Sequence, residues 1–191
     1  MKNFCSKNIL GMLLLMLMVS GAHASEQVLK QQARSSAKAL GSALKQELQS
    51  AMKEGGAIVA IKVCNEKAPE IAAQVSQTKG LNVGRTALRV RNSNNAPDAW
   101  ETKQLDNFIS RLASGEPVGQ IEAHTIDNGV FRYMKAIPTK GLCINCHGAK
   151  LSKEVSQTIQ ALYPQDQATG FAVGDIRGAF TISIPIKPSG D

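Results

Sequence analysis

The chain has 191 residues, of which 43% are hydrophobic and 19% are charged, and its net charge is +7 at pH 7. This composition supplies enough apolar side chains for one packed domain and argues against disorder. Lysine and arginine are interleaved with acidic residues along the chain. We therefore expect no clustered basic surface and no nucleic-acid binding.

The first 24 residues have the pattern of an export signal. Two lysines, Lys2 and Lys7, precede an apolar run over residues 9–19, and an A-x-A cleavage site ends at Ala24. The run is short for a bilayer, because a membrane-spanning helix needs about 20 apolar residues. We expect a cleaved signal peptide, residues 1–24, and a periplasmic protein without a membrane span. An uncleaved anchor is the alternative.

A long helix is the first element predicted after the signal. It covers residues 26–54, where leucine and methionine recur at four-residue intervals before two glycines. The continuous apolar run at 57–63 predicts a buried strand that ends at Cys64. Pro69 predicts the first turn of another helix, and residues 81–90 are expected to be extended.

The second half of the chain predicts two helices and three strands. In chain order these are a helix that begins at Pro97, a hairpin of strands 119–126 and 130–137, a helix over 153–162 and a last strand around 180–186. The hairpin prediction rests on Asp127-Asn128-Gly129, which suits positive φ angles. The last strand shows clear alternation of apolar and polar residues.

These elements predict an α+β fold, a PAS-like antiparallel sheet flanked by helices with a long N-terminal helix. The expected divisions of the chain are the signal peptide, a leading helix over residues 25–56 and one domain over residues 57–191.

Residues 143–147, Cys-Ile-Asn-Cys-His, form the attachment pattern of c-type haem. The thiols of Cys143 and Cys146 are spaced to reach two vinyl groups of one porphyrin edge. His147 then lies beneath the iron as the proximal ligand. The export signal favours haem, since attachment takes place outside the cytoplasm. One pentapeptide predicts one covalently bound haem c.

Two other chemistries fit a Cys-x-x-Cys pair. A redox dithiol of the thioredoxin type would need a βαβ context, which the predicted elements lack. A zinc site would need further ligands, which Cys64 and His124 could supply.

The sixth position of the iron decides its chemistry, and the candidates are Cys64, His124, Met52, Met134 or no side chain. The methionines are most simply core residues, and a lone strand histidine is more often a surface residue than a ligand. Cys64 is the unpaired thiol after cleavage, at a predicted helix start whose amide dipoles would depress its pKa. An inert buried cysteine explains it equally well.

Further stretches carry a family resemblance: AIKVCN at 60–65, GRT at 84–86, NAPD at 95–98, RYMK at 132–135 and GDIRG at 174–178. On these stretches the chain resembles the monohaem c-type proteins with a PAS-like haem domain. That family includes small soluble cytochromes and the sensory parts of membrane-bound histidine kinases. The resemblance covers residues 44–186. It departs from the family at Ala136, where proline is usual, and at the less usual Ile144-Asn145.

The resemblance implies a cysteine as the axial ligand opposite the histidine, and Cys64 is the matching position. Arginines in or beside the matched stretches are candidates for bidentate contacts to the haem propionates, although each is also explained as a surface residue. These candidates are Arg85, Arg91, Arg132 and Arg177, with Arg89 nearby.

A thiolate ligand stabilises ferric iron and lowers the reduction potential. This chemistry suits a redox sensor, or a sensor in which nitric oxide or carbon monoxide displaces Cys64. A periplasmic receptor would detect the change. The alternative is an electron-transfer cytochrome with a periplasmic redox partner. A peroxidase-like enzyme would need an open sixth position and a distal acid–base residue, for which His124 is the available histidine. We therefore expect a sensor or carrier and not a catalyst.

Overall fold

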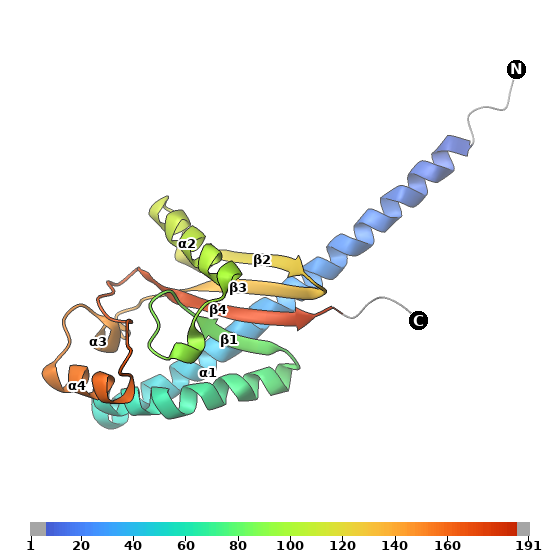
Figure 1. The fold of residues 1–191 in the computed structure, drawn as a ribbon. Coiled ribbons are helices and arrows are strands. Elements are labelled where there is room, and N and C mark those ends of the chain that lie inside the picture. Colours follow the sequence, from blue (N-terminus) through green and yellow to red (C-terminus); the bar gives the residue numbers. More distant parts are fainter. Residues whose placement is uncertain (1–6, 187–191) are drawn as a thin grey trace, which may run out of the picture.

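Four antiparallel strands form one sheet in the order β1-β4-β3-β2 (Figure 1). The computed structural model describes the backbone of residues 7–186 and the side chains of residues 25–186. The strands are β1 Asn82–Thr86, β2 Glu122–Asp127, β3 Val130–Pro138 and β4 Ile176–Pro185. The predicted hairpin is confirmed as β2 and β3. Its turn residues Asn128 and Gly129 have φ values of 48° and 73°, as a tight hairpin turn requires.

The helices are α1 Lys7–Lys79, α2 Ala99–Ala113, α3 Ile144–His147 and α4 Lys153–Leu162, with 3-10 turns η1 Ser93–Asn95 and η2 Val118–Gln120. The helices predicted after Pro97 and over residues 153–162 are confirmed as α2 and α4. Helix α2 begins behind Asp98, whose side chain accepts a hydrogen bond from the Glu101 amide while the Glu101 side chain accepts one from the Asp98 amide. This capping box satisfies two amides at the start of the helix.

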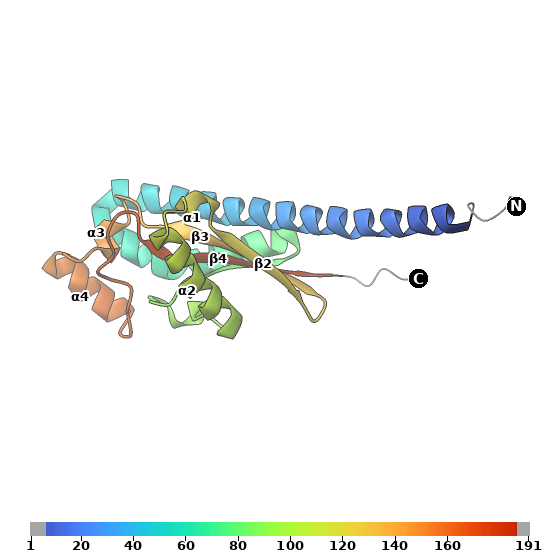
Figure 2. The same cartoon turned by 90° about the horizontal axis from the view of Figure 1, so that it is seen from above.

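Helices α1 and α2 cover opposite faces of the sheet (Figure 2). Side chains alternate along β3, so that Phe131 and Tyr133 pack with α1 and Met134 packs with α2. The α1 cluster also contains Ala33, Ala37, Leu40, Ile182 and Ile184, and the α2 cluster contains Leu105, Phe108, Ile121, Ala136 and Ala179. The alternation predicted for the last strand is therefore confirmed.

A kink at two glycines divides α1. Gly55 (φ −159°, ψ 26°) and Gly56 (φ 67°, ψ −155°) leave the helical region, and the chain turns back on itself there (Figure 1). A side chain at Gly56 would be strained, because only glycine adopts this conformation readily. We call residues 7–54 the first arm of α1 and residues 57–79 the second arm.

The second arm corrects two predictions. The strand predicted over residues 57–63 is wrong, because this run is helical. A short apolar run cannot be assigned to a strand or a buried helix by its periodicity alone. The helix start predicted at Pro69 is also wrong, since Pro69 lies inside the second arm. There it lacks the amide proton that would bond the carbonyl of Asn65.

The α+β class with an antiparallel sheet and a long N-terminal helix is confirmed. The predicted signal peptide, residues 1–24, lies outside the residues whose side chains are described, and its cleavage stays a prediction, as does the boundary at residue 56. Within the described part of the chain, no helix combines the length and hydropathy needed to cross a membrane.

A carboxylate on β2 fastens the first arm of α1 to the sheet. Arg34 donates through Nε to both oxygens of Glu122, at 3.1 Å each, and the Tyr133 hydroxyl donates to the same carboxylate at 2.7 Å. Burial alone would raise the pKa of Glu122, but these donors and the charge of Arg34 outweigh it and lower the pKa to about 2. The ionised carboxylate therefore stabilises the contact between helix and sheet.

We expect Glu122→Gln to lower the free energy of unfolding at neutral pH by about 1–2 kcal/mol, a figure that allows for the exposure of Arg34. The folded pKa lies below the reference value of 4.5. The contribution of Glu122 is thus complete above the unfolded pKa and is lost as the pH falls toward the folded value. Urea titrations of both proteins at pH 7 and pH 3 measure it. A difference that is equal at both pH values would contradict this assignment.

Candidate functional site

The Cys-x-x-Cys-His segment lies at the end of the molecule where α1 turns back, next to α4 (Figure 1). Cys143 caps α3, which carries Cys146 and His147. The segment is held by a neighbouring stretch of chain: the amides of Gly170 and Phe171 donate to the carbonyls of Gly148 and His147, at 3.0 and 2.9 Å. These backbone bonds fix the position of the segment.

The ring of His147 is oriented by a backbone carbonyl. Its Nδ1 lies 2.6 Å from the Ala168 oxygen, and since a carbonyl can only accept, Nδ1 carries the proton. This tautomer leaves the Nε2 lone pair available to a metal. Burial and the positive charges of Arg177 and Arg91 lower the pKa of His147 to about 2. The imidazole is therefore neutral, which is the form that binds metals.

Arg91 links the Cys-x-x-Cys-His segment to the loop that contains Ala168. Its Nη2 donates to the carbonyl of Cys146 at 2.7 Å and to the carbonyl of Ala168 at 3.2 Å. Its Nε donates to Asp166 at 2.9 Å, and the two side chains are 10% and 7% exposed. Arg91 is thus a buried, paired residue of the loop framework, with most of its donors engaged by the protein.

Cys64 reaches this region from the second arm of α1. Ile61, one turn earlier, packs with Val155 and Ile159 of α4, and Cys146 lies against the same cluster. Arg85 and Arg91 also lie close enough to influence the Cys64 thiol. Cys64 lies close enough to Cys146 to raise the pKa of its thiol, and His147 follows Cys146 on α3.

The predicted electrostatic environment of Cys64 is wrong. Cys64 lies inside the second arm and not at a helix N-terminus, so the expected dipole effect does not operate. Its surface is exposed, yet the protein atoms around the sulfur raise the pKa of the thiol. The positive charges of Arg85 and Arg91 offset this desolvation only in part.

Two of the candidate arginines are poorly compensated. Burial lowers the pKa of Arg85, and among the described residues no carboxylate pairs with it. Arg177 donates through Nη1 to the carbonyl of Arg89 at 3.1 Å, while its Nε is buried without a hydrogen-bond partner in the described part of the chain. Burial and the charges of Arg91 and Arg85 lower the pKa of Arg177 to about 10. Half-buried guanidinium groups without a carboxylate partner attract an anion.

Arg132 and Arg89 make other contacts. Arg132 donates to Asp98 at 2.6 Å and lies over the ring of Trp100 at 4.5 Å, so the structure does not bring it to His147. Arg89 lies over one side of the Phe171 ring, 4.0 Å from its centroid. The ring of Phe171 in turn makes an edge contact with His147, at 6.3 Å between centroids.

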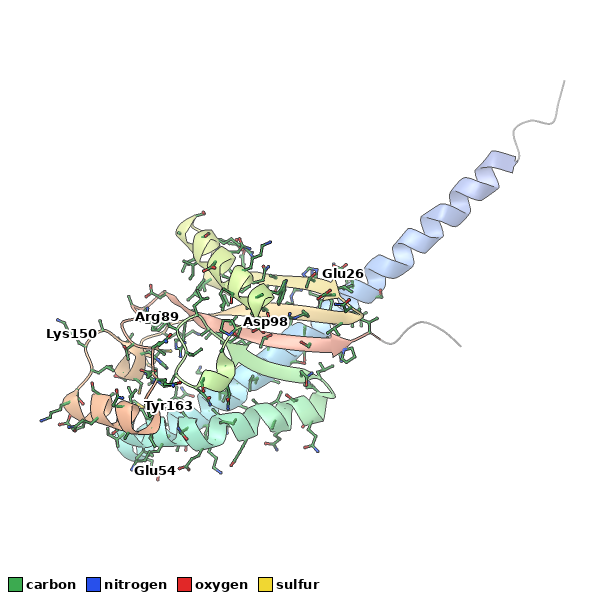
Figure 3. All side chains as sticks on the ribbon, in the orientation of Figure 1. Glu26, Glu54, Arg89, Asp98, Lys150 and Tyr163 are labelled. Carbon is green, nitrogen blue, oxygen red and sulfur yellow. The ribbon has the colours of Figure 1, made fainter. Side chains whose placement is uncertain are left out.

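Two of the other candidate ligands, His124 and Met134, lie elsewhere. His124 has its Nε2 2.9 Å from Oε1 of Glu26 and stacks on Phe131. Figure 3 shows Glu26 well away from Tyr163, which follows α4. Met134 is fully buried in the α2 cluster, and Met52 lies on the first arm. A zinc site formed by His124 together with the cysteines is therefore not assembled.

The donor set of the site fits a tetrapyrrole with acidic side chains. It comprises two thiols at fixed spacing, a neutral imidazole with Nε2 available, a third thiol from α1 and two half-buried guanidinium groups that lack a carboxylate partner among the described residues. Sequence reasoning missed Asp166 and Ala168. No motif marks them, because their roles depend on a loop that meets Arg91 about 75 residues away in sequence.

Comparisons with known proteins agree on one family. Residues 20–185 match the model of the family described as Tll0287-like. The fold is similar to that of a solved cyanobacterial protein, whose structure is titled as that of the heme-protein Tll0287, with a TM-score of 0.58 and 28% identity. The match covers 76% of this chain and 90% of that chain. Among curated proteins, none matches.

Proposed function

Since the chain belongs to the Tll0287-like family, we propose that it is a haem-binding protein that carries one haem c on Cys143 and Cys146. The solved relative is titled a heme-protein, which supports the cofactor. The observation that carries the proposal is the arrangement of His147, a half-buried neutral imidazole whose Nδ1 proton is held by the Ala168 carbonyl next to Cys146. A free Nε2 beside a thioether position is what proximal ligation requires.

In this proposal His147 is the proximal ligand and Cys64 is the opposite one. Arg85 and Arg177 would meet the propionates, because both are half-buried and lack a carboxylate partner within the described residues. Arg91 is less suited to that role, since Asp166 and two carbonyls already engage it. Arg132 is unsuited, because Asp98 and Trp100 hold it away from His147.

The bound haem would supply an iron that changes its oxidation state and can exchange a ligand. We propose that the protein is a periplasmic redox or diatomic-gas sensor, in which Cys64 yields its position to nitric oxide or carbon monoxide. The exposed position of Cys64 supports this role, since a small ligand can reach its side chain from solvent. A receptor protein would read the change.

Electron transfer with a periplasmic partner is the second candidate function. Ile144, between the two cysteines, is an exposed apolar residue with 37% of its surface accessible. An apolar contact point beside an attachment site suits brief docking of a redox partner. Stopped-flow mixing separates the roles. Rapid electron exchange that leaves the absorption spectrum of the ligands unchanged favours transfer, and a spectral change on adding nitric oxide favours sensing.

Expression of the secreted chain with a cytochrome maturation system tests the proposal as a whole. We expect the intact mass to rise by one haem and a Soret band to stay with the protein after denaturation. The Cys143→Ser, Cys146→Ser double variant is the matched control and should lose both signals. A wild-type protein without added mass would contradict covalent haem attachment.

A further inference from the structure

The carbonyl of Ala168 accepts hydrogen bonds from two side chains. His147 Nδ1 donates to it at 2.6 Å, and Arg91 Nη2 donates to it at 3.2 Å. A carbonyl that already accepts from a cation is a weaker acceptor for a second donor, because the cation draws electron density away from its oxygen. The guanidinium of Arg91 therefore acts against the hydrogen bond that polarises the His147 ring.

Asp166 sets the position and the effective charge of Arg91. Its carboxylate accepts from Arg91 Nε at 2.9 Å and from Arg91 Nη2 at 3.2 Å, and one of its oxygens accepts from the Ala168 amide at 3.1 Å. The same peptide segment is thus held at its amide by Asp166 and at its carbonyl by Arg91. Because both charged side chains are nearly buried, solvent screens them weakly.

We infer that Arg91 is a positioning residue that sets, through the Ala168 carbonyl, how strongly His147 donates to the iron, an inference that rests on the haem protein proposed above. With Arg91 in place, the Nδ1 proton is held less strongly and the imidazole is a weaker donor. Asp166 opposes this effect by drawing the guanidinium toward itself. Both residues act on the iron through His147, the Ala168 carbonyl and their own charges, without direct contact.

The opposite charges of Arg91 and Asp166 predict opposite changes in the ferrous-to-ferric ratio when each is removed. In Arg91→Gln the positive charge is lost and the Ala168 carbonyl is polarised less by its second donor, so it accepts more strongly from His147 and ferric iron is favoured. In Asp166→Asn the negative charge is lost and Arg91 is free to donate more strongly to Ala168, so ferrous iron is favoured. In a redox titration at a fixed applied potential, we expect the ferrous-to-ferric ratio to fall about three- to tenfold in the first variant and to rise by a similar factor in the second.

A purely structural role would give a different result. If Arg91 and Asp166 only hold the loop, both variants loosen it and both ratios move in the same direction, which would overturn the inference. Arg91→Lys keeps the charge and should stay close to wild type. Arg132→Gln, which removes an arginine paired with Asp98, is the matched control and should leave the ratio unchanged. A wild-type protein without a Soret band would instead contradict the proposed function.

Discussion

Cys64→Ala is expected to abolish the low-spin ferric signal of the haem-loaded protein and to raise its reduction potential by about 0.1–0.3 V, a fraction of the range of about 0.8 V that axial ligands control. The physical reason is the loss of a negatively charged sulfur, which stabilises ferric iron. Cys64 is placed for this role by the packing of Ile61 against α4 and Cys146. Electron paramagnetic resonance and a redox titration measure both effects.

The control for this experiment is Met52→Leu, which removes another candidate ligand and should leave the signal intact. Cys64→Ala should still carry its covalent haem, because attachment depends on Cys143 and Cys146. An unchanged low-spin signal in Cys64→Ala would show that another group, or none, occupies the sixth position. Binding of carbon monoxide to the ferrous variant should become faster, since no protein ligand has to leave.

Gly178→Ala is expected to destabilise the fold by about 2–3 kcal/mol. A methyl group at this position would lie 2.4 Å from the carbonyl oxygen of Thr86 and 2.9 Å from Cβ of Ala87. Thr86 is the last residue of β1 and Ala87 follows it, so the backbone at the end of this strand would have to shift. Gly178 pairs with Ile137 in the ladder between β3 and β4, so a shift there also disturbs the strand that leads into the Cys-x-x-Cys-His segment.

The matched control is Gly119→Ala, because a methyl group there would have no atom within 4 Å. Urea denaturation should show a clear drop in midpoint for Gly178→Ala and a change within about 0.5 kcal/mol for Gly119→Ala. Equal stability of the two variants would mean that β1 and β4 can separate without cost at this point.

Local patterns predicted the local features of this protein. The hairpin follows from Asn128-Gly129, the helix predicted over residues 153–162 matches the bounds of α4, and the pentapeptide at 143–147 is contiguous. Each of these depends on neighbouring residues, so periodicity and turn chemistry suffice. The strand prediction for residues 57–63 was wrong because the structure of this run does not depend on neighbouring residues alone. Its helical state is set by packing against α4, which lies about 100 residues later in the chain.

The candidate site shows the same limit. Cys64 was selected by counting thiols and by resemblance, although its predicted secondary structure was wrong. Arg132 lies within a matched stretch, yet Asp98 and Trp100 engage it on another part of the sheet. The role of Arg91 depends on Asp166 and Ala168, which no sequence pattern connects to it. Which arginines lack a carboxylate partner is visible only in three dimensions.

The position of Cys64 has a thermodynamic consequence. A bond from Cys64 to an iron that is itself held by His147 would close a covalent ring of about 80 residues, which includes the sheet strand β1 and helix α2. Such a cross-link restricts the unfolded chain, and the loop-entropy relation used for disulfides gives about 4–5 kcal/mol for a ring of this size. In the proposed haem protein, release of Cys64 would remove this restraint, so its melting temperature would depend on the state of the iron.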